Sequence, residues 1–260
     1  MDTTWQRFQD GSAQSAHAVH VYEDTAELAE SVATYLSAGF DAGQPAIVVA
    51  TPEHVQAFAD CLAGSDIADG LLLFADAEET LEALLEDDRL SRPRFDQVIG
   101  GLLDEVEERF PERRIRVFGE MVDLLCARWR PDAAFALEEL WTSLGERRHF
   151  SLLCAYRLDV FDRRAQVSVL PAVCRAHSHV RAGADPARLH LAVDAALEEA
   201  LGADVGKIYA LIGEQIRERR VPAAQLALMW VSSQMPTVAE RVLASARARY
   251  VLEPAGSTSL

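Results

Sequence analysis

Five short apolar runs recur between residues 19 and 156, and segments with helical spacing of apolar residues separate them. The runs are VHVY (19–22), AIVVA (46–50), GLLLFAD (70–76), IRVF (115–118) and FSLLCAY (150–156). Strands that are apolar on both faces are typical of a parallel sheet covered by helices on both sides. Their alternation with helices predicts an α/β fold: a three-layer, mostly parallel sheet of about five or more strands.

Helix start signals follow the apolar runs. Asp24 stands before an apolar stripe and Glu27 follows three positions later, a capping-box arrangement that satisfies free backbone amides. Thr51 and Pro52 begin the next helix, since proline is favoured in a first helical turn. The strongest stripe runs over residues 93–110, with charged residues on its other face. These signals place helices between the strands, as an α/β fold requires.

The patterns divide the chain into four segments. Residues 1–14 read as a polar lead-in, and residues 15–182 as the α/β domain. Beyond RAGADPA (181–187) no strand-like run appears, and apolar residues at helical spacing predict an all-α region of about four helices over 183–252. The polar end, residues 253–260, is expected to be a disordered tail.

The net charge of −16 disfavours several kinds of partner. An acidic surface repels phosphate backbones and anionic membranes, so we expect no direct nucleic-acid or membrane binding. The polar N-terminus does not resemble a signal peptide, and no run approaches the roughly 18 apolar residues of a membrane span. The cysteines are isolated in sequence, which indicates reduced core residues in a cytoplasmic protein. They are Cys61, Cys126, Cys154 and Cys174.

Polar residues gather at the predicted carboxyl ends of three strands. In a doubly wound sheet, ligands bind outside these ends, so polar groups from separate strands can converge on one pocket for a small molecule. The candidate ligand-binding residues are Tyr22, Glu23 and Asp24 after the first strand, Glu120 after the fourth, and Tyr156 and Arg157 at the end of the fifth. Gly119 precedes Glu120, which would allow a ligand to approach closely.

Most of these candidates also have a structural explanation. Asp24 can be a helix cap, and Glu23 and Glu120 can be acids favoured by the positive end of a helix. Tyr22 and Tyr156 can be core aromatics with one end in water. For these residues the sequence leaves both interpretations open.

His17 and His20 are the remaining candidate ligand-binding residues. Their spacing puts them on opposite faces of a strand, which argues against joint metal ligation, although an irregular segment would let them converge. Cys174, His177 and His179 form a weak C-x2-H-x-H pattern, for which capping or surface histidines are the more common outcome. We therefore assign neither a metal site nor a cofactor from the sequence.

The usual motif for phosphate transfer is missing. Such chemistry needs a glycine-rich loop after a strand and a lysine that contacts the phosphates. After the first predicted strand the chain reads YEDTAELAES, with acids and without glycine or lysine. Lys207 is the only lysine, and its segment GADVGK (202–207) lacks the glycine spacing and a preceding strand. Nucleophile-elbow and zinc-protease motifs are also absent, so we predict that the chain is not an enzyme.

Six blocks of the chain, taken together, resemble the MEDS family, the methanogen/methylotroph sensory domain known from a dichloromethane-responsive regulator. They are HAVHVYED, GFDAGQPAIVVATPEH, FGEMVDLL, LEELWTSL, FSLLCAY and CRAHSHV, in that order, over about residues 15 to 180. The resemblance implies a RecA-like fold, here without a phosphate-binding loop, and a sensory role. Relatives carry a cysteine in the first block where this chain has His-Ala-Val-His, which argues against thiol chemistry at that corner.

The resemblance also implies how such a protein acts. A small molecule, such as a hydrocarbon derivative, is bound, and its state is relayed to an attached or separate partner. Because relatives are often fused to histidine kinase or DNA-binding modules, a histidine kinase or a transcription-regulatory protein is the expected partner in signal transduction. The chain contains neither module in recognisable form.

Two other functions compete with a sensor. The chain could be a scaffold or regulatory interaction protein, whose helical region, rich in Met and Trp at ALMWVSSQMP (227–236), docks to a partner or forms a homo-oligomer. It could also be a degenerate nucleotide binder that holds a nucleotide without the phosphate-binding loop.

Overall fold

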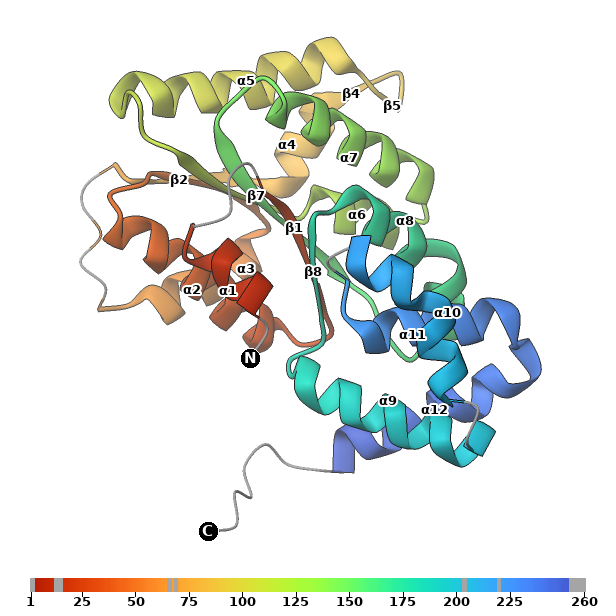
Figure 1. Cartoon of the computed structure of the whole chain (residues 1–260). Coiled ribbons are helices and arrows are strands. Elements are labelled where there is room, and N and C mark those ends of the chain that lie inside the picture. Colours follow the sequence, from red (N-terminus) through yellow and green to blue (C-terminus); the bar gives the residue numbers. More distant parts are fainter. Residues whose placement is uncertain are drawn as a thin grey trace.

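The computed structural model describes residues 3–11, 16–64, 67, 70–202, 205–218 and 221–252. Six of its strands form one parallel sheet in the order β3-β2-β6-β7-β1-β8 (Figure 1). The strands are β1 (His17–Tyr22), β2 (Ala46–Ala50), β3 (Leu72–Asp76), β6 (Ile115–Gly119), β7 (Phe150–Arg157) and β8 (His179–Ala182). The predicted α/β class and parallel sheet are therefore confirmed, and each predicted run overlaps a strand, although β3 begins two residues after the start of its run, at Leu72.

Helices cover both faces of the sheet and build two cores. One core contains Ala18, Val48 and Phe118 from the strands, together with apolar residues of α1 (Thr3–Gln9), α2 (Thr25–Asp41) and α3 (Pro52–Leu62). The other core contains Val19 and Val49 from the opposite strand faces. The helices that cover it are α4 (Ala77–Leu84), α5 (Arg92–Arg109), α6 (Met121–Ala127), α7 (Pro131–Gly145) and α8 (Leu170–Ala176). Between α4 and α5, the strands β4 (Leu85–Glu86) and β5 (Arg89–Leu90) form a small antiparallel hairpin.

The polar lead-in differs from its prediction. Within residues 1–14, α1 forms and buries Trp5 and Phe8, whose spacing of three residues places both on one face of the helix. The Phe8 ring stacks on the Tyr35 ring of α2 at 5.0 Å. Two aromatic residues in a polar segment are enough to dock a short helix, because each removes a large apolar area from water.

Four helices follow the sheet, in agreement with the predicted helical region: α9 (Pro186–Leu201), α10 (Val205–Glu218), α11 (Ala223–Gln234) and α12 (Pro236–Leu252). Their buried residues belong to the same core as α7 and α8, so these helices pack on the α/β layers. The junction includes η1 (Ala165–Val169), a π-helical turn that runs directly into α8. Gln225 of α11 donates a hydrogen bond to Gln166 of η1 at 2.9 Å, and both side chains are buried.

Two further expectations concern the ends and surface of the chain. Residues 253–260, the predicted disordered tail, lie outside the described residues. Among the helices that the structure describes, none combines the length and apolar character needed to cross a membrane.

A buried arginine joins α1, α2 and the sheet. Arg116 of β6 is 1 % exposed, and its guanidinium donates to the carbonyl oxygens of Gln9 and Tyr35 at 2.6 Å each and to Gln44 Oε1 at 2.8 Å. Burial lowers the pKa of Arg116. The guanidinium fits because Gly39 in α2 has no side chain: a Cβ there would lie 2.5 Å from Arg116 Cδ.

We expect Gly39→Ala to lower the free energy of unfolding by about 1–3 kcal/mol, because the added methyl group overpacks the site against Arg116. Gly101→Ala is the matched control, since Gly101 is also helical but a Cβ there meets nothing within 4 Å. It should raise the free energy of unfolding by about 0.5–1 kcal/mol through helix propensity. Urea unfolding of both variants measures the difference. Equal effects of the two substitutions would contradict the assigned packing.

Candidate functional site

Three of the predicted strand-end residues, Tyr22, Glu120 and Arg157, lie around Asp123 of α6, and we call these four residues the strand-end corner. Tyr22 Oη donates to Asp123 Oδ2 at 3.3 Å, and the backbone N–H of Arg157 donates to Asp123 Oδ1 at 2.8 Å. Burial raises the pKa of Asp123 to about 6, the Arg157 N–H opposes this, and the nearby Glu120 carboxylate adds to it. The structure thus brings together two strand ends through an acid that sequence reasoning did not select.

Glu120 is part of the same corner, but its oxygens are already bonded. Its side chain is 2 % exposed; Oε1 accepts the backbone N–H of Thr51 at 2.5 Å and Oε2 lies 2.5 Å from His54 Nδ1. Burial acts to lower the pKa of His54, but the hydrogen bond and charge of Glu120 outweigh it, so the pKa is raised. The pair ties the start of α3 to the end of β6.

The other candidates at this edge have local roles. Asp24 is the N-cap of α2, because its Oδ1 accepts the N–H groups of Ala26 and Glu27. Glu23 is exposed. His20 is fully buried, and its Nε2 lies 2.9 Å from Glu27 Oε1.

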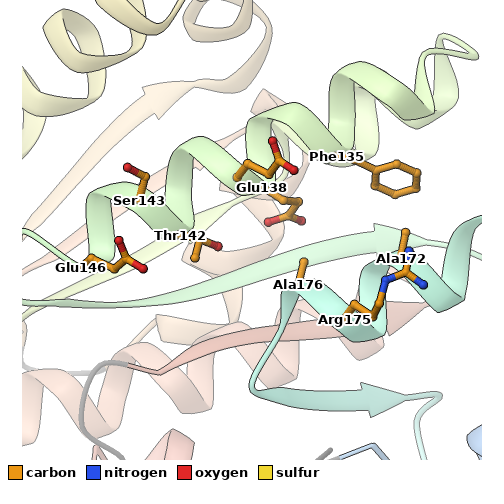
Figure 2. A pocket seen from close by; sticks show the side chains of 9 residues that line it. Phe135, Glu138, Thr142, Ser143, Glu146, Ala172, Arg175 and Ala176 are labelled. Atoms are coloured by element: carbon orange, nitrogen blue, oxygen red, sulfur yellow. The ribbon is translucent and has the colours of Figure 1, made fainter.

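A groove of about 430 Å³ opens between α7 and α8 (Figure 2). Its walls combine apolar, hydroxyl and charged side chains, and the buried Glu138 lies at its base. The lining residues are Phe135, Glu138, Glu139, Thr142 and Ser143 from α7, its C-cap Glu146, and Ala172, Arg175 and Ala176 from α8. This combination suits a small, mildly polar molecule.

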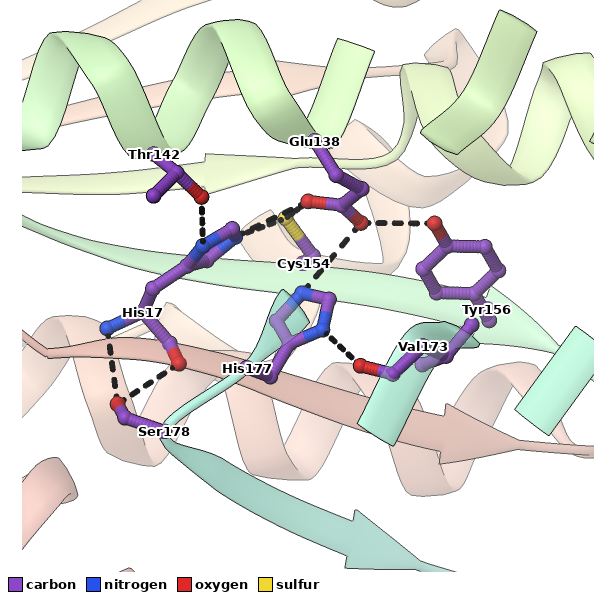
Figure 3. A network of polar contacts seen from close by, with 8 residues as sticks. All are labelled: His17, Glu138, Thr142, Cys154, Tyr156, Val173, His177 and Ser178. Carbon is purple, nitrogen blue, oxygen red and sulfur yellow. Dashed lines mark hydrogen bonds and ion pairs between the residues drawn. The ribbon is translucent and has the colours of Figure 1, made fainter. Parts of the chain in front are cut away.

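Below the groove, Glu138 is surrounded by four side chains from the sheet and α8 (Figure 3). Its Oε2 lies 3.1 Å from His17 Nε2 and 3.7 Å from Cys154 Sγ. Its Oε1 accepts the hydroxyl of Tyr156 at 2.7 Å and lies 3.4 Å from His177 Nε2. His17 Nε2 is in turn 3.3 Å from Cys154 Sγ. We call these five residues the Glu138 cluster.

Each histidine of the cluster has a contact to Nδ1, the ring nitrogen that does not face Glu138. His177 Nδ1 lies 2.7 Å from the carbonyl oxygen of Val173, so this nitrogen carries a proton and donates it to Val173, and Nε2 faces Glu138. Thr142 Oγ1 lies 3.5 Å from His17 Nδ1. Nε2 of His177 is buried and has no hydrogen-bond partner. The cluster therefore holds ring nitrogens close to a carboxylate and a thiol.

Charges in the cluster are strongly coupled. Burial raises the pKa values of the Cys154 thiol and the Tyr156 hydroxyl well above their ordinary values, and the Glu138 carboxylate adds to both shifts. Burial lowers the pKa of His17, and the charge of His177 lowers it further. Burial acts to raise the pKa of Glu138, but the facing His177 and His17 bring it well below its usual range. Glu138 is thus the buried anion of this face.

The structure differs from the sequence prediction in two respects. Tyr156 and His17 point to the Glu138 side of the sheet, away from Tyr22, so they do not join the strand-end corner. His177 and His179 are both buried, so the surface interpretation is wrong, although His177 does cap α8 through Val173. His179 faces the other core, with its ring 5.7 Å from Phe8.

The sequence analysis did not select Glu138 and Cys154 as site residues, because each lies in a segment whose apolar pattern predicts only core residues. An acid within the apolar stripe of α7 was the available signal, since a buried carboxylate needs partners. The partners of Glu138 come from β1, β7 and the end of α8. His17 and Glu138 are more than a hundred positions apart in the sequence, so no local pattern connects them.

Comparison with known proteins gives one family match. The family model described as "MEDS: MEthanogen/methylotroph, DcmR Sensory domain" matches residues 16–178. No curated protein matches. Among solved structures, one described as "Structure of C. elegans PCH-2" is similar at 12 % identity and a TM-score of 0.38, covering 95 % of this chain and 67 % of that one.

The His54–Glu120 pair predicts a pH-dependent part of the stability. Because the folded-state pKa of His54 is raised above 6.5, the pair stabilises the folded protein fully below pH 6.5, and this contribution is lost as the pH rises through the folded-state pKa. His54→Asn keeps a donor near the Nδ1 position but cannot become charged. We expect the variant to be less stable than wild type by about 1–2 kcal/mol at about pH 5.5.

Urea unfolding of both proteins at several pH values measures this difference, which should shrink towards about pH 9. Comparing the two proteins removes the titration of groups that they share. A difference that stays constant over the whole range would mean that His54 carries no extra charge in the folded state.

Proposed function

Because the chain belongs to the MEDS family and so has a sensory or regulatory role, we propose that it senses a small molecule bound in the groove between α7 and α8. In this proposal the protein is not an enzyme, and it passes its ligand state to a protein partner through the helical region. The observation that carries the proposal is the position of the buried Glu138 cluster at the base of an open groove.

The chemistry of the groove supports a small ligand with an apolar body and a polar end. Phe135, Ala172 and Ala176 offer apolar contact, while Thr142 and Arg175 offer hydrogen bonds. A hydrocarbon derivative that carries a hydroxyl, carbonyl or halogen group has this character. A hydroxyl end can donate to the Glu138 carboxylate, whereas a carbonyl or halogen end would lie towards the donors Thr142 and Arg175.

The connection of α8 supports a route for the signal. Ala172 and Ala176 line the groove on α8, which continues without a break from η1. Gln166 of η1 is hydrogen-bonded to Gln225 of α11. Since π-helical turns often mark functional sites, we infer that a shift of α8 can be transmitted to α11 through the Gln166–Gln225 contact. A ligand drives such a shift only if it binds one of the two arrangements more tightly.

The absence of catalysis is supported by two features of the described residues. At the end of β1, where a nucleotide-hydrolysing enzyme would hold phosphates, the chain places Glu23 and Asp24. In the Glu138 cluster, the raised pKa values of Cys154 and Tyr156 keep both groups protonated and therefore poor nucleophiles.

A scaffold function is the second candidate, and two exposed leucines favour it. Leu191 of α9 is 65 % exposed and Leu211 of α10 is 64 % exposed, so the helical region presents apolar side chains to a partner or a second copy. The Met- and Trp-rich segment 227–236, which the sequence analysis considered for docking, is less exposed than these two leucines. Met229 and Trp230 are half-buried and pack against the core.

A ligand screen with groove variants tests the sensor. Wild type is screened by thermal shift against small alcohols, halocarbons, aromatics and nucleotides, and a compound that binds should raise the melting temperature. Ala172→Phe fills the groove and should abolish the shift, whereas Ala136→Phe, on an exposed position of the other wall helix, α7, should leave it unchanged. Circular dichroism checks that both variants fold.

The same screen separates the two candidate sites. If Ala172→Phe keeps the shift and Glu120→Gln removes it, the ligand binds at the strand-end corner and the groove assignment fails. A shift produced by nucleotides alone would favour the degenerate nucleotide binder.

The signal route has its own test. Gln225→Leu removes the hydrogen bond to Gln166 and should cost about 1–2 kcal/mol of stability. We expect the variant to bind the ligand as wild type does but to lose the ligand-induced change of amide hydrogen exchange in α11. Gln234→Leu, at the exposed end of the same helix, is the control. An unchanged exchange response in Gln225→Leu would rule out this connection.

A further inference from the structure

We propose that His17, Glu138, Cys154 and His177 form a binding site for one divalent transition metal ion of the zinc type. Each residue offers one ligand atom, and these four atoms all lie within 4.8 Å of one another. Imidazole nitrogen, thiolate sulfur and carboxylate oxygen are the ligand types that zinc prefers in proteins. The metal site shares Glu138 with the groove, but metal binding and groove-ligand binding are measured separately, so either proposal can fail without the other.

The distances between the ligand atoms fit a tetrahedral ion. With zinc–ligand bonds of about 2.0–2.3 Å, tetrahedral geometry puts two nitrogen or oxygen ligands about 3.3 Å apart, and sulfur about 3.6 Å from either. In the cluster, Glu138 oxygens lie 3.1 Å from His17 Nε2 and 3.4 Å from His177 Nε2. Cys154 Sγ lies 3.3 Å from His17 Nε2 and 3.7 Å from Glu138 Oε2. Three of the six edges, those that join Glu138 Oε2, His17 Nε2 and Cys154 Sγ, thus match to within about 0.3 Å, whereas the His177 distance is measured to the other Glu138 oxygen.

The surrounding groups orient the ligands in the way that metal sites require. A metal-binding histidine usually donates its other N–H to an oxygen, which fixes the tautomer and aims the free nitrogen at the ion. His177 does so through Val173, and its Nε2 is left buried without a hydrogen-bond partner. Tyr156 donates to Glu138 and Thr142 lies beside His17, so a carboxylate and the second histidine are oriented as well.

The charge of the site supports the same conclusion. A carboxylate and a thiolate carry two negative charges, two neutral histidines add none, and a divalent cation brings the total to zero. A neutral total suits a buried position, where an uncompensated charge is costly. The thiolate is the form of cysteine that binds a metal, so metal binding would release the thiol proton.

Cobalt(II) is the probe for the experiment, because it enters zinc sites and reports their geometry by absorption. The full chain is freed of metal by chelation and titrated with Co²⁺, then with competing Zn²⁺. We expect one equivalent to bind, with the visible bands of tetrahedral cobalt and the near-ultraviolet band of a thiolate ligand. Elemental analysis gives the stoichiometry, and a chelator should lower the melting temperature of the loaded protein.

Matched variants assign the site. Cys154→Ser should lose the thiolate band and most of the affinity, whereas Cys126→Ser, a half-buried cysteine outside the cluster, should keep both. Tyr156→Phe keeps all four ligands but removes the hydrogen bond to Glu138, so the affinity should fall by about 10–100-fold while the thiolate band remains.

Three results would overturn the proposal: no stoichiometric binding by the wild-type chain, bound cobalt without a thiolate band, or equal affinity in Cys154→Ser and wild type. The first two use only the wild-type protein, so the proposal stays testable even where a variant does not fold. A buried ion pair of Glu138 with a protonated histidine would be the remaining explanation of the cluster.

Discussion

One buried carboxylate sets the organisation of the face on which the groove opens. Glu138 is 1 % exposed, and burial of an unpaired charge would cost several kcal/mol, so it must be surrounded by groups that stabilise it. Those groups come from β1, β7 and the end of α8. The contacts of one α7 residue therefore fix how a helix, two neighbouring strands and a second helix meet. The groove above them follows from that arrangement.

The alternation of β1 explains why the chain has two separate polar sites. His17 and Tyr22 lie on opposite faces of a strand that packs helices on both sides, so one joins Glu138 and the other joins Asp123. The strand-end corner satisfies its own polar groups: Glu120 is bonded to Thr51 and His54. The Glu138 cluster keeps a buried nitrogen without a hydrogen-bond partner and lies beside an open groove. That difference is why the second site is the better candidate for recognition.

Much of the fold could be predicted from local patterns, and the site could not. The apolar runs and helical stripes identify five of the six main strands, because burial on both faces leaves a direct signature in composition. The sixth, β8, is short and carries His179 and Arg181, so it has no such signature. The Glu138 cluster depends on strand order: β1 lies between β7 and β8, which places His17 near Cys154 and His177. Strand order is a property of the whole sheet, and a single sequence does not reveal it.

The two walls of the groove are held differently, which would give the proposed signal a direction. α7 is tied to two strands at mid-helix, because Glu138 contacts His17 of β1 and Tyr156 of β7. α8 meets the cluster only through His177, the residue that follows its last turn. In the proposed sensor, a ligand that separates the walls would therefore move α8 more easily than α7. Since α8 continues from η1, and η1 contacts α11 through Gln166, the displacement would reach the helical region.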